Sequence, residues 1–93
     1  MEVRWLRTAL RNLDEAAAYI ARDDPRAATR MVARIRTAVA RLATHPAMGR
    51  PGRVPGTREL VVAGTRYIVP YRIQRGRVEI IRVLHSAQQW PRR

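Results

Sequence analysis

Two amphipathic stretches in the first half of the chain are separated by only Asp23 and Asp24, so the helices they predict must fold back on each other. Apolar residues recur every three or four positions through residues 6–20 and again through residues 28–42, with charged residues on the opposite side. Asp24 followed by Pro25 is typical of a helix start, because Asp can accept a hydrogen bond from a first-turn amide and Pro lacks only a donor that is unpaired there. The sequence therefore predicts an antiparallel helical hairpin.

The second half of the chain predicts a loop followed by strands. Residues 44–57 interleave Pro with Gly and are expected to form a loop. Three runs with strand-like composition follow at 58–62, 67–73 and 78–85, joined by Gly-bearing connections of hairpin length. Pro70 lies inside the middle run, where it cannot donate to a ladder, so we expect either a bulge or a locally unpaired position there.

These elements predict an α+β fold of two layers. Residues 2–5 alternate as a short opening strand, and the apolar stripe of the hairpin can be buried against one face of a sheet. We therefore expect an N-terminal strand and an antiparallel helical hairpin packed on an antiparallel β-sheet, with the other sheet face semi-open. A chain of 93 residues has room for a single domain, residues 1–93.

Charge narrows the choice of partners. The chain has 19 basic residues, all of them arginine, against 7 acidic residues, for a net charge of +12. Arginine presents a planar fork of donors that suits carboxylate and phosphate groups, and it stays protonated. The composition therefore predicts an anionic partner, either an acidic protein or nucleic acid.

Several classes of site and location are not expected. No stretch approaches the roughly 20 apolar residues of a membrane span, and the first residues do not resemble a signal peptide, so we expect a cytoplasmic protein with no membrane partner. The chain contains no cysteine. His45 and His85 are far apart in the sequence with no carboxylate spaced to join them, so neither a metal nor a cofactor is predicted.

The residues leave the chemistry of His85 open. It is a titratable group near neutral pH at a predicted strand end, close to Arg82 in the sequence. It could act as a general acid or base on RNA whose phosphate is held by arginines, or it could be a hydrogen-bonded structural residue that closes the sheet. Trp5 and Trp90 could stack on bases, or could seal the two ends of a small core. Glu59 and Glu79 lie on different predicted strands and are expected to pair with neighbouring arginines.

The order of elements and five local strings resemble the RelE/ParE superfamily of toxins from type II toxin–antitoxin modules. The strings are AAYIA at 17–21, GRPGRV at 49–54, GTRELVV at 56–62, YIVPYR at 67–72 and RVLHSAQQWP at 82–91. They span nearly the whole chain. The resemblance implies the two-layer RelE/ParE-like fold.

Within this superfamily, RelE-like members cut messenger RNA on the ribosome, whereas ParE-like members act on DNA gyrase without known hydrolytic chemistry. The ribonuclease branch places an arginine after the first aromatic of the middle strand, where this chain has Ile68. The branch with a His-Tyr ending needs a Tyr after His85, where this chain has Ser86. The strings at 67–72 and 82–91 are similar to the ParE branch. The resemblance therefore implies a ParE-like toxin that inhibits DNA gyrase, arrests growth and has no catalytic residue.

Partners follow from the same resemblance and from the charge. We expect a cognate, ParD-like antitoxin whose acidic, amphipathic C-terminal segment lies across the semi-open sheet face and the helical hairpin. The residues expected to contact partners are Arg50, Arg53, Arg58, Arg72, Arg82 and Trp90. The alternative function is a ribosome-dependent mRNA endonuclease in which Arg58, Arg82 and His85 bind phosphate and transfer protons. A third hypothesis is a nucleic-acid-binding module that uses the basic helix face.

Overall fold

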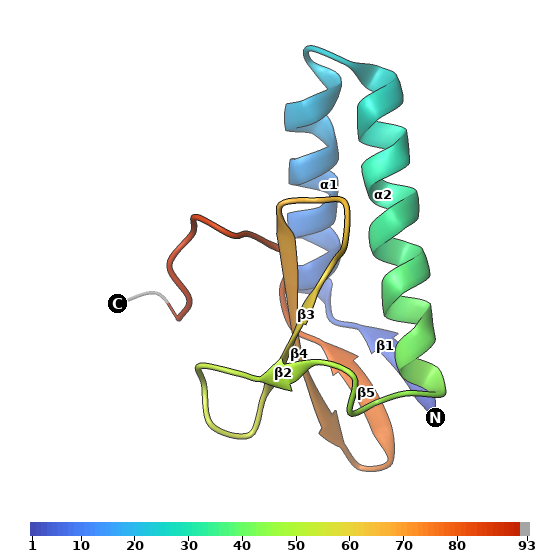
Figure 1. Cartoon of the computed structure of the whole chain (residues 1–93), viewed down its shortest axis with the longest axis vertical. Coiled ribbons are helices and arrows are strands. Elements are labelled where there is room, and N and C mark those ends of the chain that lie inside the picture. The colour runs from blue at the N-terminus through green and yellow to red at the C-terminus, as the bar shows by residue number, and fades with distance from the viewer. Residues whose placement is uncertain (92–93) are drawn as a thin grey trace.

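The helical hairpin follows a short first strand. In the computed structural model, which describes residues 1–91, helix α1 spans Arg7–Ala21 and helix α2 spans Pro25–Ala40 (Figure 1). A short 3-10 helix, Arg41–Ala43, continues α2. The two helices lie side by side and antiparallel, as predicted, and none of the described helices is long and apolar enough to cross a membrane.

The two helices begin differently. The Asp24 side chain accepts a hydrogen bond from the Ala27 backbone N–H at 3.1 Å, and Pro25 is the first residue of α2, so the predicted helix start is confirmed. Helix α1 has no such side-chain cap at Leu6. The Leu6 N–H instead donates to the Ile80 carbonyl at 3.0 Å, which anchors the start of α1 to the sheet.

The sheet is mixed rather than antiparallel throughout, which corrects our prediction. Its strands are β1 (Glu2–Trp5), β2 (Arg50–Pro51), β3 (Arg58–Val61), β4 (Tyr67–Gln74), β5 (Arg77–Ile80) and β6 (Leu84–His85). Their order is β1-β5-β4-β3-β2, with β6 also pairing with β4. Strand β1 runs parallel to β5, and the other pairs are antiparallel. Alternation of side chains identifies a strand but not its direction, which depends here on how the chain returns from the hairpin.

The predicted third run, 78–85, is wrong as a single strand. Strand β5 ends at Ile80, and β6 begins only at Leu84. Between them the N–H groups of Ile81 and Arg82 both point to the Pro70 carbonyl, at 2.9 and 3.4 Å. In an extended strand the N–H and C=O of one residue point to the same side, so the donor that Pro70 lacks faces this break. Pro70 therefore costs the sheet no ladder hydrogen bond.

The break also changes which side chains face the core. Val78 and Ile80 are buried in the core, and Val83 is buried there with them, although an unbroken strand over 78–85 would place Val83 on the opposite face. The core lies between the helices and the sheet, with Tyr71 of β4 fully buried and Tyr67 packed against the core on the same strand face. Trp5 packs on this core.

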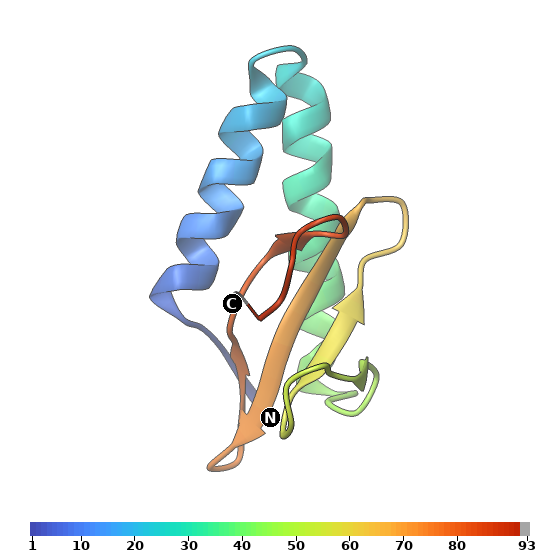
Figure 2. The same ribbon diagram turned by 90° about the vertical axis from the view of Figure 1, so that its left-hand side faces the viewer.

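The sheet face away from the helices is partly covered by two irregular segments. Figure 2 shows the residues after β6 passing in front of β4, on the side opposite α1 and α2, with the 44–57 loop beside them. We call this the outer face. Part of the predicted loop is the two-residue strand β2, which is too short to leave an alternating pattern in the sequence.

Candidate functional site

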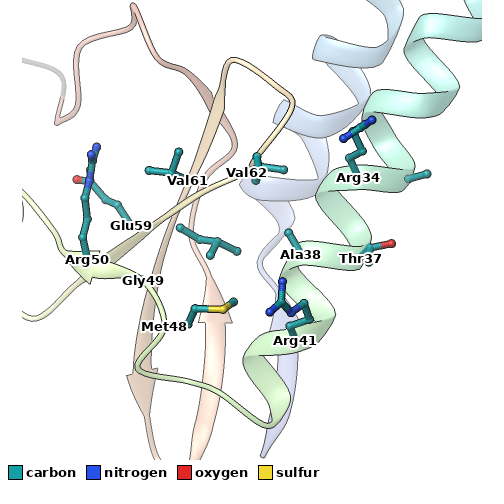
Figure 3. A pocket seen from close by; sticks show the side chains of 13 residues that line it. Arg34, Thr37, Ala38, Arg41, Met48, Gly49, Arg50, Glu59, Val61 and Val62 are labelled. Carbon is teal, nitrogen blue, oxygen red and sulfur yellow. The ribbon is translucent and has the colours of Figure 1, made fainter.

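A groove lies between α2 and the end of β3 (Figure 3). Its volume is about 580 Å³. Ala38 and Thr37 of α2 lie on one side, Val62 lies on the other, and Met48 of the loop lies at one end. The lining is mostly apolar, which is typical of surfaces that bind a protein segment.

The edge of β3 is open beside this groove. Strand β2 pairs with β3 only at Arg58 and Glu59, so among the described strands none pairs with Val61 on that side. The Val62 N–H donates to the Tyr67 carbonyl at 3.1 Å, and successive residues of a strand point to opposite sides. The Val61 N–H and C=O therefore point away from β4, and its side chain is 53% exposed. Such an edge can accept an added strand.

One arginine of α2 and one of the 3-10 helix that continues it line the same groove. Arg34 and Arg41 are seven residues apart, so they lie on the same side of the helix. Neither forms an ion pair with a carboxylate among residues 1–91. The Arg34 guanidinium contacts Gly64, which has a φ of +77° in the turn after β3 and where a Cβ would collide with it. The groove thus combines an apolar lining, an open strand edge and two cations.

Sequence reasoning missed most of this groove. Of the residues predicted to contact partners, Arg50 lines its sheet side and none lies on its α2 side, and Val61 was read only as part of a strand. The spacing of Arg34 and Arg41 is the one signal that points to it. An open strand edge depends on where β2 stops, which the sequence does not reveal.

The outer face carries a charged array that crosses the sheet. Residues paired across strands have their side chains on the same face. The register therefore places on it the polar residues and proline Glu2, Arg4, Arg50, Glu59, Pro70, Arg72, Gln74, Arg77 and Glu79, followed by the apolar row Val61, Ile68 and Leu84. Three of the six predicted partner-binding residues belong to this array or contact it: Arg50, Arg53 and Arg72.

Each of two buried carboxylates holds two arginines in this array. Glu59 accepts from Arg50 at 3.2 Å and from the Arg53 backbone N–H at 3.0 Å, with the Arg53 Nε at 3.4 Å. Glu79 accepts from Arg72 Nε at 2.7 Å and lies 3.1 Å from an Arg77 terminal nitrogen.

Their burial is unequal. The glutamate side chains are 1% and 7% exposed, while the four arginines are 28% to 54% exposed. The predicted pairing of Glu59 and Glu79 with neighbouring arginines is confirmed.

These contacts set the ionisation of both glutamates. Burial alone would raise the pKa of Glu59, but the hydrogen bonds from Arg53 and Arg50 and their positive charges outweigh it, so the pKa lies below its ordinary value of 4.5. The hydrogen bond from Arg72 is the largest influence on Glu79, and with Arg77 it lowers that pKa despite burial. Both side chains are carboxylates at neutral pH.

The structure gives Arg58, Arg82 and His85 different neighbours. Arg58 donates to the carbonyls of Ala47 and Gly49, at 3.3 and 2.8 Å, and so ties the loop to β3. Arg82 lies over the Trp90 ring, 5.7 Å from its centre. His85 packs edge-on against Tyr67, with 5.6 Å between ring centres.

His85 closes the turn that follows β6. Its Nδ1 accepts a hydrogen bond from the Ala87 N–H at 3.1 Å, and its own N–H donates to Gln88 Oε1 at 2.7 Å. In the neutral ring the proton is then on Nε2, so neither nitrogen offers a free lone pair to act as a base. These contacts fit a structural role. Within residues 1–91, no group of three His, Asp or Glu side chains is placed to hold a metal ion.

Comparisons with known proteins extend over almost the whole chain. Residues 3–90 match the family described as "ParE toxin of type II toxin-antitoxin system, parDE". A Sinorhizobium fredii protein described as "Putative toxin Y4kP" is 62% identical over 89 residues, which cover 96% of this chain and 92% of the relative.

Two further relatives are more distant. A Caulobacter vibrioides protein named "Toxin RelE2" is 38% identical over 87 residues, covering 94% of this chain and 97% of the relative. A solved structure described as a chromosomal ParDE toxin–antitoxin system from P. aeruginosa superposes with a TM-score of 0.81 at 28% identity, covering 91% of this chain and 95% of that one.

Proposed function

This chain belongs to the ParE toxin family of type II toxin–antitoxin systems, and we propose that it arrests growth by inhibiting DNA gyrase and is neutralised by a cognate antitoxin bound in the groove between α2 and β3. Membership of a toxin–antitoxin family implies an antitoxin partner. The target and the site of neutralisation are the proposed parts.

The open groove is the observation that carries the proposed site of neutralisation. It offers an apolar lining that would otherwise remain in water, and the Val61 N–H and C=O at its edge have no strand partner within the described residues. An antitoxin segment that extends the sheet beside β3 would supply both missing partners. Acidic side chains on that segment would meet Arg34 and Arg41.

Gyrase is the target that agrees best with the contacts of His85 and with the residues at positions 68 and 86. The ribonuclease hypothesis needs a proton-transfer group, and the contacts of His85 leave it poorly suited to that role. Ile68 and Ser86 stand where the ribonuclease branches are expected to carry Arg and Tyr. A toxin that acts by surface recognition needs neither group.

A paired assay tests the target. The purified chain is added to DNA gyrase in a supercoiling assay, and in parallel to a translation reaction whose messages are mapped for cleavage. We expect supercoiling to be inhibited, to recover when antitoxin is added, and messages to stay intact. Cleavage of translated messages with no effect on gyrase would establish the ribonuclease alternative instead.

Substitution of Val61 tests the site of neutralisation. Val61→Pro removes the N–H that faces the groove and leaves the bonds between β3 and β4 in place, because Pro is tolerated on an edge strand. We expect antitoxin affinity to fall at least about tenfold, as expected when a central interface hydrogen bond is lost and the added strand is displaced. Co-expressed antitoxin should then no longer rescue growth.

Val61→Ala is the matched control, because it shortens the same side chain but keeps the N–H. It should bind antitoxin nearly as well as the unchanged chain does. Equal losses in the two variants would mean that the side chain, and not an added strand, makes the contact.

A further inference from the structure

We propose that the outer face of the sheet binds the phosphodiester backbone of duplex DNA directly, through Arg50, Arg53, Arg72 and Arg77. This contact goes beyond the proposed inhibition of gyrase and does not depend on it. It concerns the sheet face away from the helices (Figure 2), which adjoins the groove at Arg50 and Glu59.

The arginines of the outer face are held in place rather than free. Glu59 fixes Arg50 and Arg53, and Glu79 fixes Arg72 and Arg77, in each case through the contacts of 2.7 to 3.4 Å described above. Each carboxylate neutralises one of its two guanidinium groups, so each cluster keeps one net positive charge. A guanidinium has five N–H donors, and those not used on glutamate remain available to a phosphate.

Burying two carboxylates beneath a solvent-facing surface requires an explanation. Removing a carboxylate from water is costly, and well-packed apolar residues often stabilise a fold as well as a buried ion pair does. The visible result of the arrangement is that four partly exposed guanidinium groups are ordered before any partner arrives. Ordered donors lose less conformational entropy when they bind an anion.

The width of the array suits an extended anion. The four arginines are carried by β2, the loop after it, β4 and β5, and Arg4 of β1 extends the same face. Five adjacent strands spaced by about 4.8 Å span roughly 19 Å. Along that distance one strand of duplex DNA presents several phosphates, at about 3.4 Å of helix axis each.

The chemistry of the outer face favours duplex DNA over single-stranded nucleic acid. Proteins that bind single strands usually stack bases on exposed aromatic rings. Here Tyr71 is fully buried, Tyr67 packs on the core beneath the helices, and Trp90 is partly buried with Arg82 over its ring. The face therefore offers cations for a backbone but no row of rings for bases.

An acidic protein is also a poorer match. Protein interfaces depend on a few buried aromatic or aliphatic anchors, and the groove provides that kind of lining. Most paired rows of the outer face place Arg, Glu, Pro and Gln there instead, and in its apolar row Ile68 and Leu84 are buried while Val61 is exposed. The two surfaces thus differ in the partner chemistry that they suit.

Binding to a labelled 20-base-pair duplex tests the proposal. With four phosphate contacts, the affinity should fall roughly 100-fold between 50 and 200 mM salt, because bound counterions are released. The double variant Arg50→Gln, Arg72→Gln leaves Glu59 paired with Arg53 and Glu79 paired with Arg77. It should weaken binding at least about tenfold and reduce the salt slope by about 2.

The matched control removes the same charge from the helices. Arg26→Gln, Arg36→Gln changes two exposed arginines of α2 that line neither the groove nor the outer face. It should weaken binding less than about threefold. Equal losses in the two double variants would overturn the proposal, because total charge and not the outer face would then control binding.

Two measurements need no substitution. NMR signals of the arginine Nε–H groups of the unchanged chain should shift on addition of duplex for Arg50 and Arg72 but not for Arg26 and Arg36. Duplex should also bind more tightly than a single-stranded RNA 20-mer or polyglutamate of equal charge. Tighter binding of either competitor, or shifts confined to the helices, would overturn the assignment.

Discussion

Tyr71 joins the loop of residues 44–57 to the core through a single hydroxyl group. The ring is fully buried, and its hydroxyl donates to the Pro46 carbonyl at 2.6 Å while accepting from the Gly49 N–H at 2.8 Å. Gly49 lies so close to the ring that a Cβ there would approach Tyr71 Cε1 to 2.6 Å. Met48 and Gly49 also line the groove, so this contact helps to set the groove's shape.

Tyr71→Phe should lower the free energy of unfolding by about 1–3 kcal/mol, because the Gly49 N–H and the Pro46 carbonyl both lose their partner. It should also weaken antitoxin binding, since Met48 is no longer held. Urea denaturation and a binding titration measure the two effects. Tyr67→Phe is the control, because the same change at a partly buried ring should cost less than about 0.5 kcal/mol. Equal costs at both positions would contradict the role given to the Tyr71 hydroxyl.

His85→Ala should leave growth arrest and gyrase inhibition largely intact. The side chain closes a turn and packs on Tyr67, and nothing in these contacts requires it to transfer a proton. Toxicity in cells and supercoiling by purified gyrase are measured together with a thermal melting curve. Loss of toxicity with an unchanged melting curve would favour the ribonuclease alternative, in which His85 is catalytic.

Strand β2 is held to β3 by charge as much as by its backbone. It is two residues long, and Glu59 pairs with Arg50 of β2 and with Arg53 of the loop that follows. The pKa of Glu59 is lower in the folded chain than in the unfolded chain. A carboxyl group of this kind stabilises the fold above its unfolded pKa, and this stabilisation is lost as the pH falls through the folded pKa.

Glu59→Gln should therefore lower the free energy of unfolding at neutral pH and change it much less in acid. The amide can still accept hydrogen bonds but carries no charge, so we expect a loss of about 1–2 kcal/mol in unfolding free energy at pH 7. Below the folded pKa, where the wild-type side chain is also neutral, the two proteins should converge. Urea denaturation from pH 3 to pH 7 measures this, and parallel curves for the two proteins would contradict it.

The helices could be predicted closely from the sequence, whereas parts of the sheet could not. Periodicity over more than a dozen residues and the Asp24-Pro25 start located α2 to within a few residues. The break between β5 and β6 was missed because it depends on the Pro70 carbonyl, which lies on another strand. The same limit applies to the site. Arg50, Arg53 and Arg72 were predicted as partner-binding residues whereas Arg77 was not, and the groove depends on where β2 stops pairing with β3.

The molecule as a whole presents two surfaces of different chemistry. The groove beside α2 is mostly apolar and lies next to an open strand edge, whereas the outer face carries a charged array with its arginines held by two buried glutamates. All the cations are arginine, so both surfaces offer planar donors to an anion. The two surfaces meet at Arg50 and Glu59, which also line the groove, so two partners of different chemistry would compete only for that shared edge.

The net charge of +12 should govern how fast the antitoxin arrives more than how long it stays. An acidic antitoxin segment is attracted from a distance, and salt screens that attraction, so the association rate constant should fall at least about tenfold between low salt and 0.5 M salt. The dissociation rate constant should change little, because the bound segment is held by apolar contacts in the groove and by strand pairing at Val61. Stopped-flow association and dissociation by competition measure the two rates.

The double variant Arg34→Gln, Arg41→Gln should slow association more than the double variant Arg26→Gln, Arg36→Gln, since only the first pair lines the groove. A complex that dissociates completely at moderate salt would mean that charge, and not the groove, holds the antitoxin.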